Sequence, residues 1–226
     1  MPAPPTTPSH RPRTGTSRAW QASAGFALLV LFTALGLVAR NGTDLDRALS
    51  SGLHGVWRTA AGDIAGIAGL VLGPVLPVLL AVALAVAALR HRRSDPHLAG
   101  LLVRVLVVLG TCRLVSAVAK PLFTRDRPRQ FPDWAFPSGH VTSVAATGFA
   151  VWLLAAWTAP HLRRRAAVAA GAAIAVCAAS RIVLEVHWLT DTVGAVVGVT
   201  GAGLVTAAAL RLTPVPPGPP GVQSAP

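Results

Sequence analysis

Charged residues are scarce in this chain: only 12% of its 226 residues are Asp, Glu, Lys or Arg. A soluble domain carries about 25% charged residues, and 53% of this chain is hydrophobic. The composition therefore excludes an ordinary soluble protein and indicates a membrane protein. Acidic residues are the scarcest, with 8 Asp and Glu against 20 Lys and Arg and a formal net charge of +12.

Cysteine is also nearly absent. Cys112 and Cys177 fall in different apolar stretches, which favours two small buried side chains over a disulfide or a metal pair. No Cys/His cluster has the spacing of a structural zinc site. The sequence also lacks a glycine-rich phosphate loop with GKS or GKT, which speaks against nucleotide-driven chemistry. We therefore expect neither a metal nor another cofactor.

What the chain does have is six apolar stretches long enough to span a bilayer, which takes roughly 20 residues in a helix. They are Trp20–Ala39, Ile64–Leu89, Leu98–Ala119, Val141–Ala159, Ala166–Val186 and His187–Leu210. The sequence therefore predicts an all-α integral membrane protein with one domain, residues 19–212, in which six transmembrane helices form a compact bundle. Residues 1–18 and 213–226 are rich in Pro, Thr, Ser and Gly, and we expect both tails to be disordered.

The basic residues are divided unequally between the two sides of this six-span arrangement. The side that holds both tails has a net charge of about +9 and the other side about +1, so the positive-inside rule makes the first side cytoplasmic. This distribution favours a multi-pass plasma-membrane protein with cytoplasmic termini and argues against nucleic acid as a partner. Alternatively, the first span is a cleaved signal peptide, although it is long for one.

Pro137-Ser138-Gly139-His140 stands where an outer loop meets the fourth span. A helix N-terminus leaves free N–H groups and carries partial positive charge, so it favours a phosphate. Gly139 allows a ligand to approach the backbone closely, and Ser138 adds a hydroxyl donor. The alternative is a plain helix cap followed by a histidine at the membrane interface.

The loop before this tetrapeptide is dense in charge. Lys120 and Arg127 could together hold an oxyanion, because arginine offers a planar fork of donors and lysine a mobile point charge. We expect Arg125 and Arg129 to be solvated or in contact with lipid headgroups.

His187 and Asp191 are four residues apart and share one face of a helix that begins there. A carboxylate that bonds one imidazole nitrogen leaves the other nitrogen as a nucleophile or base. The alternative is a pair that satisfies only its own hydrogen bonds. Arg181 is a third candidate ligand of phosphate, although Glu185 is placed to compete for it at the same spacing.

In this order, Lys-x6-Arg-Pro, Pro-Ser-Gly-His and Ser-Arg-x5-His-x3-Asp resemble the signature motifs of the type 2 phosphatidic acid phosphatase family, whose superfamily includes the vanadium-dependent haloperoxidases. The resemblance covers residues 120–191 and implies a metal-independent phosphatase that works through a phosphohistidine. It implies His187 as the nucleophile, Asp191 as its orienting partner and His140 as the acid. The phosphoryl ligands that it implies are Lys120, Arg127, Ser138, the Gly139 N–H and Arg181.

Together these observations predict an enzyme whose active site lies at the outer face and acts on a membrane lipid. An isoprenoid diphosphate is the favoured substrate, and a phosphatidate- or phosphatidylglycerophosphate-type glycerolipid is the alternative. A transporter or flippase that binds a phospholipid headgroup is a third hypothesis, but transporters tend to place polar residues near the midplane. The sequence leaves the oligomeric state open.

Arg113 lies seven residues before Lys120 in the third span, so both side chains share nearly one helix face. An arginine inside a membrane usually has a partner. We expect it to point into the bundle and to pair with Asp191, with Glu185 as the second choice. The alternative is that Arg113 reaches up to the outer water.

Overall fold

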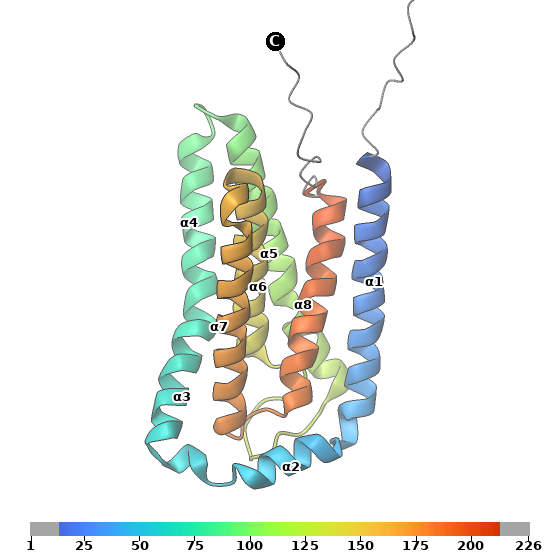
Figure 1. The fold of residues 1–226 in the computed structure, drawn as a ribbon, viewed down its shortest axis with the longest axis vertical. Coiled ribbons are helices and arrows are strands. Elements are labelled where there is room, and N and C mark those ends of the chain that lie inside the picture. Colours follow the sequence, from blue (N-terminus) through green and yellow to red (C-terminus); the bar gives the residue numbers. More distant parts are fainter. Residues whose placement is uncertain (1–13, 213–226) are drawn as a thin grey trace, which may run out of the picture.

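The computed structural model describes residues 14–212, so residues 1–13 and 213–226 of the two expected tails lie outside the described residues, whereas 14–18 already belong to the first helix. Within that range every regular element is a helix. The long helices run up and down side by side, and the short helix α2 lies across one end of the bundle (Figure 1). The longer elements are α1 (Thr14–Val38), α2 (Asp44–Gly52), α3 (Ala60–Leu70), α4 (Leu76–His91), α5 (Pro96–Phe123), α6 (Gly139–Thr158), α7 (Arg163–Val183) and α8 (Leu189–Ala209).

Six helical segments are long and apolar enough to cross a membrane, which confirms the predicted all-α bundle with six spans. They are Ser17–Asn41, Ala60–His91, Pro96–Phe123, Gly139–Thr158, Pro160–Val183 and Leu189–Ala209. The second of them joins α3 to α4 through a π-helical segment, η3 (Val71–Val75), which contains Pro74. Proline lacks an N–H and disturbs a regular helix, so the irregular segment falls where the sequence places Gly73-Pro74.

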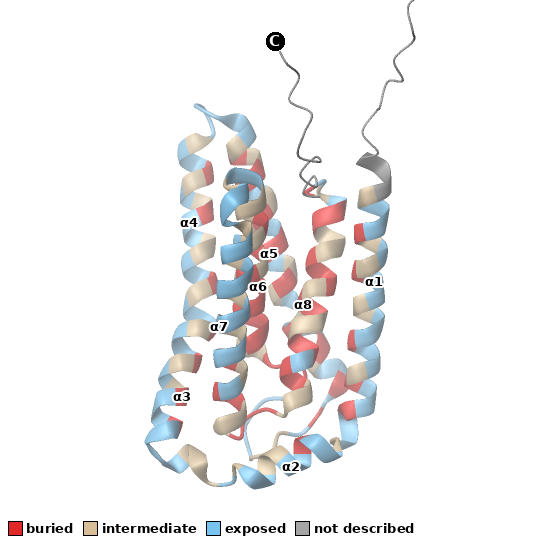
Figure 2. Cartoon of the chain, in the orientation of Figure 1, coloured by how far each residue is buried: buried red, intermediate tan, exposed pale blue. Residues whose placement is uncertain are grey.

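Helices α6 and α8 form the centre of the bundle. About half of their residues are buried, whereas α3, α4 and α7 present largely exposed outer faces (Figure 2). Helix α1 approaches α8 closely because both contain glycine at the contact: a side chain at Gly201 would come within 2.9 Å of the Gly25 carbonyl oxygen. Small residues at helix contacts of this kind are typical of membrane bundles.

The predicted boundaries of the turn between the last two spans were wrong. The sequence placed their border between Val186 and His187, but α7 ends at Val183 and α8 begins at Leu189. Glu185 lies in the turn with a positive φ of 53°, and His187 is outside both helices. The nucleophile candidate therefore sits in a tight connection between two rigid helices.

Candidate active site

The predicted site residues come together at one end of the bundle, where α5 and α7 end and α6 and α8 begin. One cavity of about 470 Å³ is lined by Lys120, Arg127, Gly139, His140, Arg181 and His187. Its size is within the usual range for a small-molecule site. Ser138 and Asp191, the other two predicted residues, are fully buried next to it. The spacing of the three motifs thus predicted a real cluster.

His187 is held on both sides of its ring. Its Nδ1 atom is 3.4 Å from Oδ2 of Asp191, which also accepts a 2.8 Å hydrogen bond from the Trp188 backbone N–H. Its Nε2 atom is 3.2 Å from a guanidinium nitrogen of Arg127. Burial lowers the pKa of His187 to about 4, against the opposing effect of Asp191. The imidazole is therefore neutral at pH 7, with a proton on Nδ1 matching Asp191 and a lone pair on Nε2.

Arg125 is the main residue that the sequence interpretation placed wrongly. It is only 2% exposed and is neither solvated nor near headgroups. Its guanidinium donates to Oδ1 of Asp191 at 2.6 Å and to Oδ2 of Asp46 at 2.8 Å. Arg125 therefore holds the carboxylate oxygen that His187 does not use.

Asp46 brings the short helix α2, which lies across the end of the bundle, into this network. It closes a capping box with Thr43 at the start of α2, and it accepts hydrogen bonds from the N–H and the hydroxyl of Thr190 at 3.0 and 2.7 Å. Burial by itself would raise the pKa of Asp46, but the hydrogen bonds from Thr190 and Arg125 keep that pKa below its ordinary value. The carboxylate therefore stays charged beside Arg125. The one sequence signal for Asp46 was the Thr-x-x-Asp pattern of the capping box.

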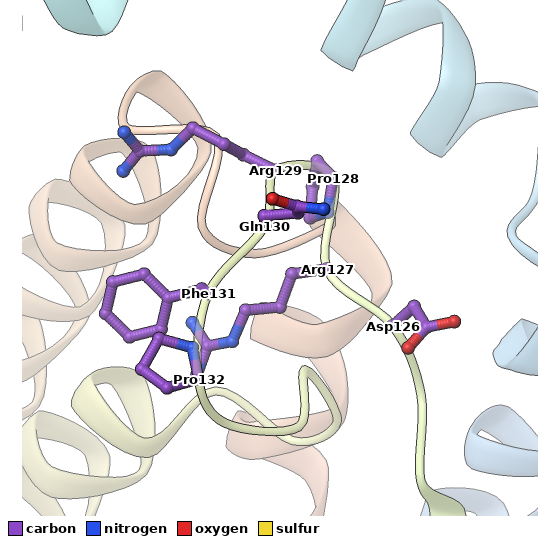
Figure 3. Close-up of a pocket in the computed structure, with 7 residues that line it drawn as sticks. All are labelled: Asp126, Arg127, Pro128, Arg129, Gln130, Phe131 and Pro132. Carbon is purple, nitrogen blue, oxygen red and sulfur yellow. The ribbon is translucent and has the colours of Figure 1, made fainter.

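Arg127 and Lys120 share a carboxylate, Asp133. Lys120 contacts the Asp133 carboxylate and donates to the Trp134 carbonyl at 2.6 Å. The Arg127 Nε donates to the Asp133 carbonyl oxygen at 2.5 Å. In Figure 3 the side chain of Arg127 runs back under its loop toward Phe131, whose ring centre is 4.4 Å from the guanidinium carbon. Both cations of the first motif are therefore placed in the cavity, in contact with one acidic side chain.

The loop of Figure 3, residues 126–132, lines a further pocket of about 650 Å³. Arg129 belongs to this loop and also lines the main cavity. Its guanidinium carbon lies 4.1 Å from the ring centre of Trp57. Arg129 is half-buried and packs against this aromatic side chain, so the expectation that it is solvated or in contact with lipid headgroups stays a prediction.

Arg181 is fixed by α3 and not by Glu185. It donates to the Ala65 carbonyl oxygen and to the Ser180 hydroxyl, each at 3.2 Å. Gly69 makes this possible, since a Cβ there would overlap the guanidinium. Glu185 instead accepts a 2.6 Å hydrogen bond from the Gly55 N–H. Glu185 therefore does not pair with Arg181, and it does not compete with a phosphate for that guanidinium in this geometry.

The Pro-Ser-Gly-His segment opens α6, as the sequence predicted. Ser138 is the residue before the helix, but its side chain makes no capping hydrogen bond, and its Oγ is buried without a partner among the described residues. Its backbone N–H donates to the Asp191 carbonyl oxygen at 3.1 Å. This geometry disfavours the plain helix-cap interpretation and leaves the hydroxyl available.

Arg113 does not pair with Asp191 or with Glu185. One of its guanidinium nitrogens donates to the Gly139 carbonyl oxygen at 3.2 Å and to the Ser143 hydroxyl at 2.6 Å. The expectation of an Asp191 pair was wrong because Arg125 already occupies that carboxylate. Arg113 points into the bundle as expected, toward the first turn of α6.

The family model described as the PAP2 superfamily matches residues 101–214, which contain all three motifs. The chain belongs to the PAP2 superfamily. This membership confirms the resemblance that the motifs suggested. No curated protein matches the chain.

One solved structure shares the PAP2 fold of this chain: the crystal structure of a transmembrane PAP2-type phosphatidylglycerolphosphate phosphatase from Bacillus subtilis. The two superpose with a TM-score of 0.63 over 83% of this chain and 94% of the other, at 22% sequence identity. At that identity the likeness establishes the fold, a multi-pass helical membrane protein. Among residues 14–212 of this PAP2 chain, no three His, Cys, Asp or Glu side chains group as metal ligands.

Proposed function

We propose that this PAP2 protein is a membrane phosphatase that hydrolyses a lipid phosphate or diphosphate through a phosphohistidine at His187. The observation that carries the proposal is the buried, neutral imidazole of His187, backed by Asp191 on Nδ1 and turned with Nε2 toward the cavity cations. Phosphoryl transfer depends mainly on positioning and on charge stabilisation. Lys120, Arg127 and Arg181 supply positive charge for the phosphoryl oxygens.

In the first step the lone pair of Nε2 attacks phosphorus, and the bond from phosphorus to the leaving-group oxygen breaks. His140 gives its proton to that oxygen, so the product leaves as an alcohol or a lipid monophosphate. In the second step a water attacks the phosphohistidine, His140 takes a proton from this water, and inorganic phosphate is released from Nε2. The same histidine thus acts as acid and then as base.

Segments that are long and apolar enough to cross a membrane contribute to the lining of the cavity, through Pro74 of η3 and through Ser116 and Ala117 of α5. This lining supports a lipid substrate. The isoprenoid diphosphate that the sequence favoured stays a prediction. The glycerolipid alternative gains support from the Bacillus subtilis structure, which is that of a phosphatidylglycerolphosphate phosphatase.

The deciding experiment is release of inorganic phosphate by the purified protein in detergent from isoprenyl diphosphate, phosphatidylglycerophosphate and phosphatidic acid. We expect turnover of at least one of them with no added metal and full activity in EDTA, because Lys120, Arg127 and Arg181 take the part that Mg²⁺ plays elsewhere. A strict requirement for a divalent cation would contradict this assignment of charge stabilisation. Failure to hydrolyse any of the three lipids would contradict the proposed function.

We also propose that the site faces outward in the plasma membrane and that both termini are cytoplasmic, on the strength of the charge difference between the two ends of the bundle. Ser51 on α2 and Ser94 between α4 and α5 are exposed at opposite ends. A membrane-impermeant thiol reagent on intact cells should label Ser51→Cys and spare Ser94→Cys. The unsubstituted protein is the control, since Cys112 and Cys177 are buried. Labelling of Ser94→Cys alone would invert the topology.

A further inference from the structure

Arg113 lines the same cavity as the catalytic residues but is not part of any of the three motifs. It shares this cavity with Ser116, Ala117 and Lys120, the residues three, four and seven positions further along α5. Positions with this spacing lie on one helix face. Arg113 and Lys120 are about 10 Å apart along the helix axis, so Arg113 marks the part of the cavity that lies deeper in the bundle.

The charge of Arg113 has no acidic partner in the part of the chain that the structure describes. Lys120, Arg125 and Arg127 each form an ion pair with a carboxylate, whereas Arg113 has only a carbonyl oxygen and a hydroxyl. Ionisable side chains inside a membrane protein are costly and are usually paired. An unpaired guanidinium that faces a cavity therefore indicates an anionic ligand.

The place where Arg113 is held strengthens this argument. It contacts the N-terminal end of α6, through Gly139 and Ser143. A helix N-terminus carries partial positive charge, so a cation is unfavourable there unless an anion is also present. Arg104, the other arginine inside α5, differs in this respect, because it donates to the Leu210 carbonyl oxygen at the C-terminal end of α8, where a cation is favourable.

The position of His140 shows which part of a substrate would meet Arg113. In the proposed mechanism His140 protonates the leaving-group oxygen, and His140, in the first turn of α6, lines the same cavity as Arg113. Arg113 is therefore beside the leaving group, toward the membrane, and not beside the phosphoryl group that is transferred to His187. Lys120, Arg127 and Arg181 already serve that group.

Resting on the proposed function, we propose that Arg113 forms a subsite for a second phosphate of the substrate, one that stays on the leaving group. Two classes of lipid carry such a phosphate. In an isoprenyl diphosphate it is joined to the transferred phosphate through one bridging oxygen, and in phosphatidylglycerophosphate a glycerol separates the two. Phosphatidic acid has a single phosphate and leaves the subsite without an anion.

The test compares kcat/KM for the two double-phosphate lipids with kcat/KM for phosphatidic acid, in mixed micelles, for the wild type and for Arg113→Gln. The ratio of double-phosphate to single-phosphate activity should fall by roughly ten- to a hundredfold in Arg113→Gln, the range of one charge-assisted hydrogen bond. Arg113→Lys keeps the charge and should retain part of the ratio. If kcat/KM falls for only one of the double-phosphate lipids, the subsite fits the separation between the two phosphates of that lipid.

Ser143→Ala is the matched control, because it removes one of the two hydrogen bonds that Arg113 makes to α6 but keeps the arginine. Its ratio should stay within about threefold of the wild type, well below the effect of a charged hydrogen bond. Equal losses on all three lipids in Arg113→Gln would overturn the subsite and leave Arg113 as a tie between two helices. That result would leave the proposed phosphatase activity intact. Absence of hydrolysis by the wild type would instead contradict both the proposed function and the subsite.

Discussion

Replacing His187 by alanine is expected to reduce phosphate release by at least about 10⁴-fold, the scale on which removal of a covalent nucleophile acts. Asp191 would keep its contacts with Arg125 and Trp188 in this variant, so the fold should survive. The measurement is kcat on whichever lipid the wild type hydrolyses, together with the thermal unfolding temperature. His161→Ala, at an exposed position in the connection between α6 and α7, is the matched control and should leave kcat unchanged.

The intermediate provides an independent readout of the same hypothesis. In this experiment the wild-type protein is mixed with a lipid that is labelled in its terminal phosphate, and the reaction is quenched in base. The protein should then carry label that is stable to base and labile to acid, because a phosphorus–nitrogen bond has this stability. The label should be missing in His187→Ala. Retention of substantial activity in this variant would remove His187 as the nucleophile, whatever the substrate proves to be.

The second large effect is expected for Arg125, which the sequence motif does not include. Arg125→Met leaves Asp46 and Asp191 buried without their cation. Loss of one partner from such a buried group typically lowers the free energy of unfolding by about 3–5 kcal/mol. Activity should fall by about a hundredfold in the protein that remains folded, because Asp191 is no longer fixed behind His187 and small displacements at a reacting centre are costly.

A second substitution separates stability from activity. Asp46→Asn combined with Arg125→Met removes one of the two stranded charges, so part of the stability should return while activity stays low. The measurements are unfolding in detergent and kcat for both single variants and the double variant. Arg58→Met, an exposed arginine at the same end, is the control. If the double variant regained activity in proportion to its stability, Arg125 would have only a structural role.

The helices were predictable because long apolar runs leave few alternatives in a membrane. Even the irregular segment η3 falls at the Gly73-Pro74 pair that the sequence displays. The turn from Val183 to Leu189 was harder to predict, because apolar residues continue through it and neither glycine nor proline marks the end of α7. Helix ends in such continuous stretches carry little local signal.

The candidate site was predictable to the extent that its residues lie in short motifs. Its supporting residues were not, because Asp46 and Arg125 are 79 positions apart and meet only once α2 folds across the end of the bundle. Arg113 was assigned the wrong partner for the same reason: spacing along a helix shows the face on which a side chain lies, but the partner comes from another helix. Nor did the sequence show that Gly69 and Gly73 leave room for the side chains of Arg181 and His140, which a Cβ at these positions would overlap.

The carboxylate of Asp133 has a further consequence for the catalytic cycle. Because Asp133 contacts both Lys120 and Arg127, an arriving phosphate must compete with a negative charge that is attached to the same protein. This intramolecular competitor weakens the binding of every phosphate, including the inorganic phosphate that hydrolysis produces. Since the side chain is about half exposed, it can move aside at little cost and return as the product departs. The enzyme would thereby bind phosphate groups less tightly and release its product faster.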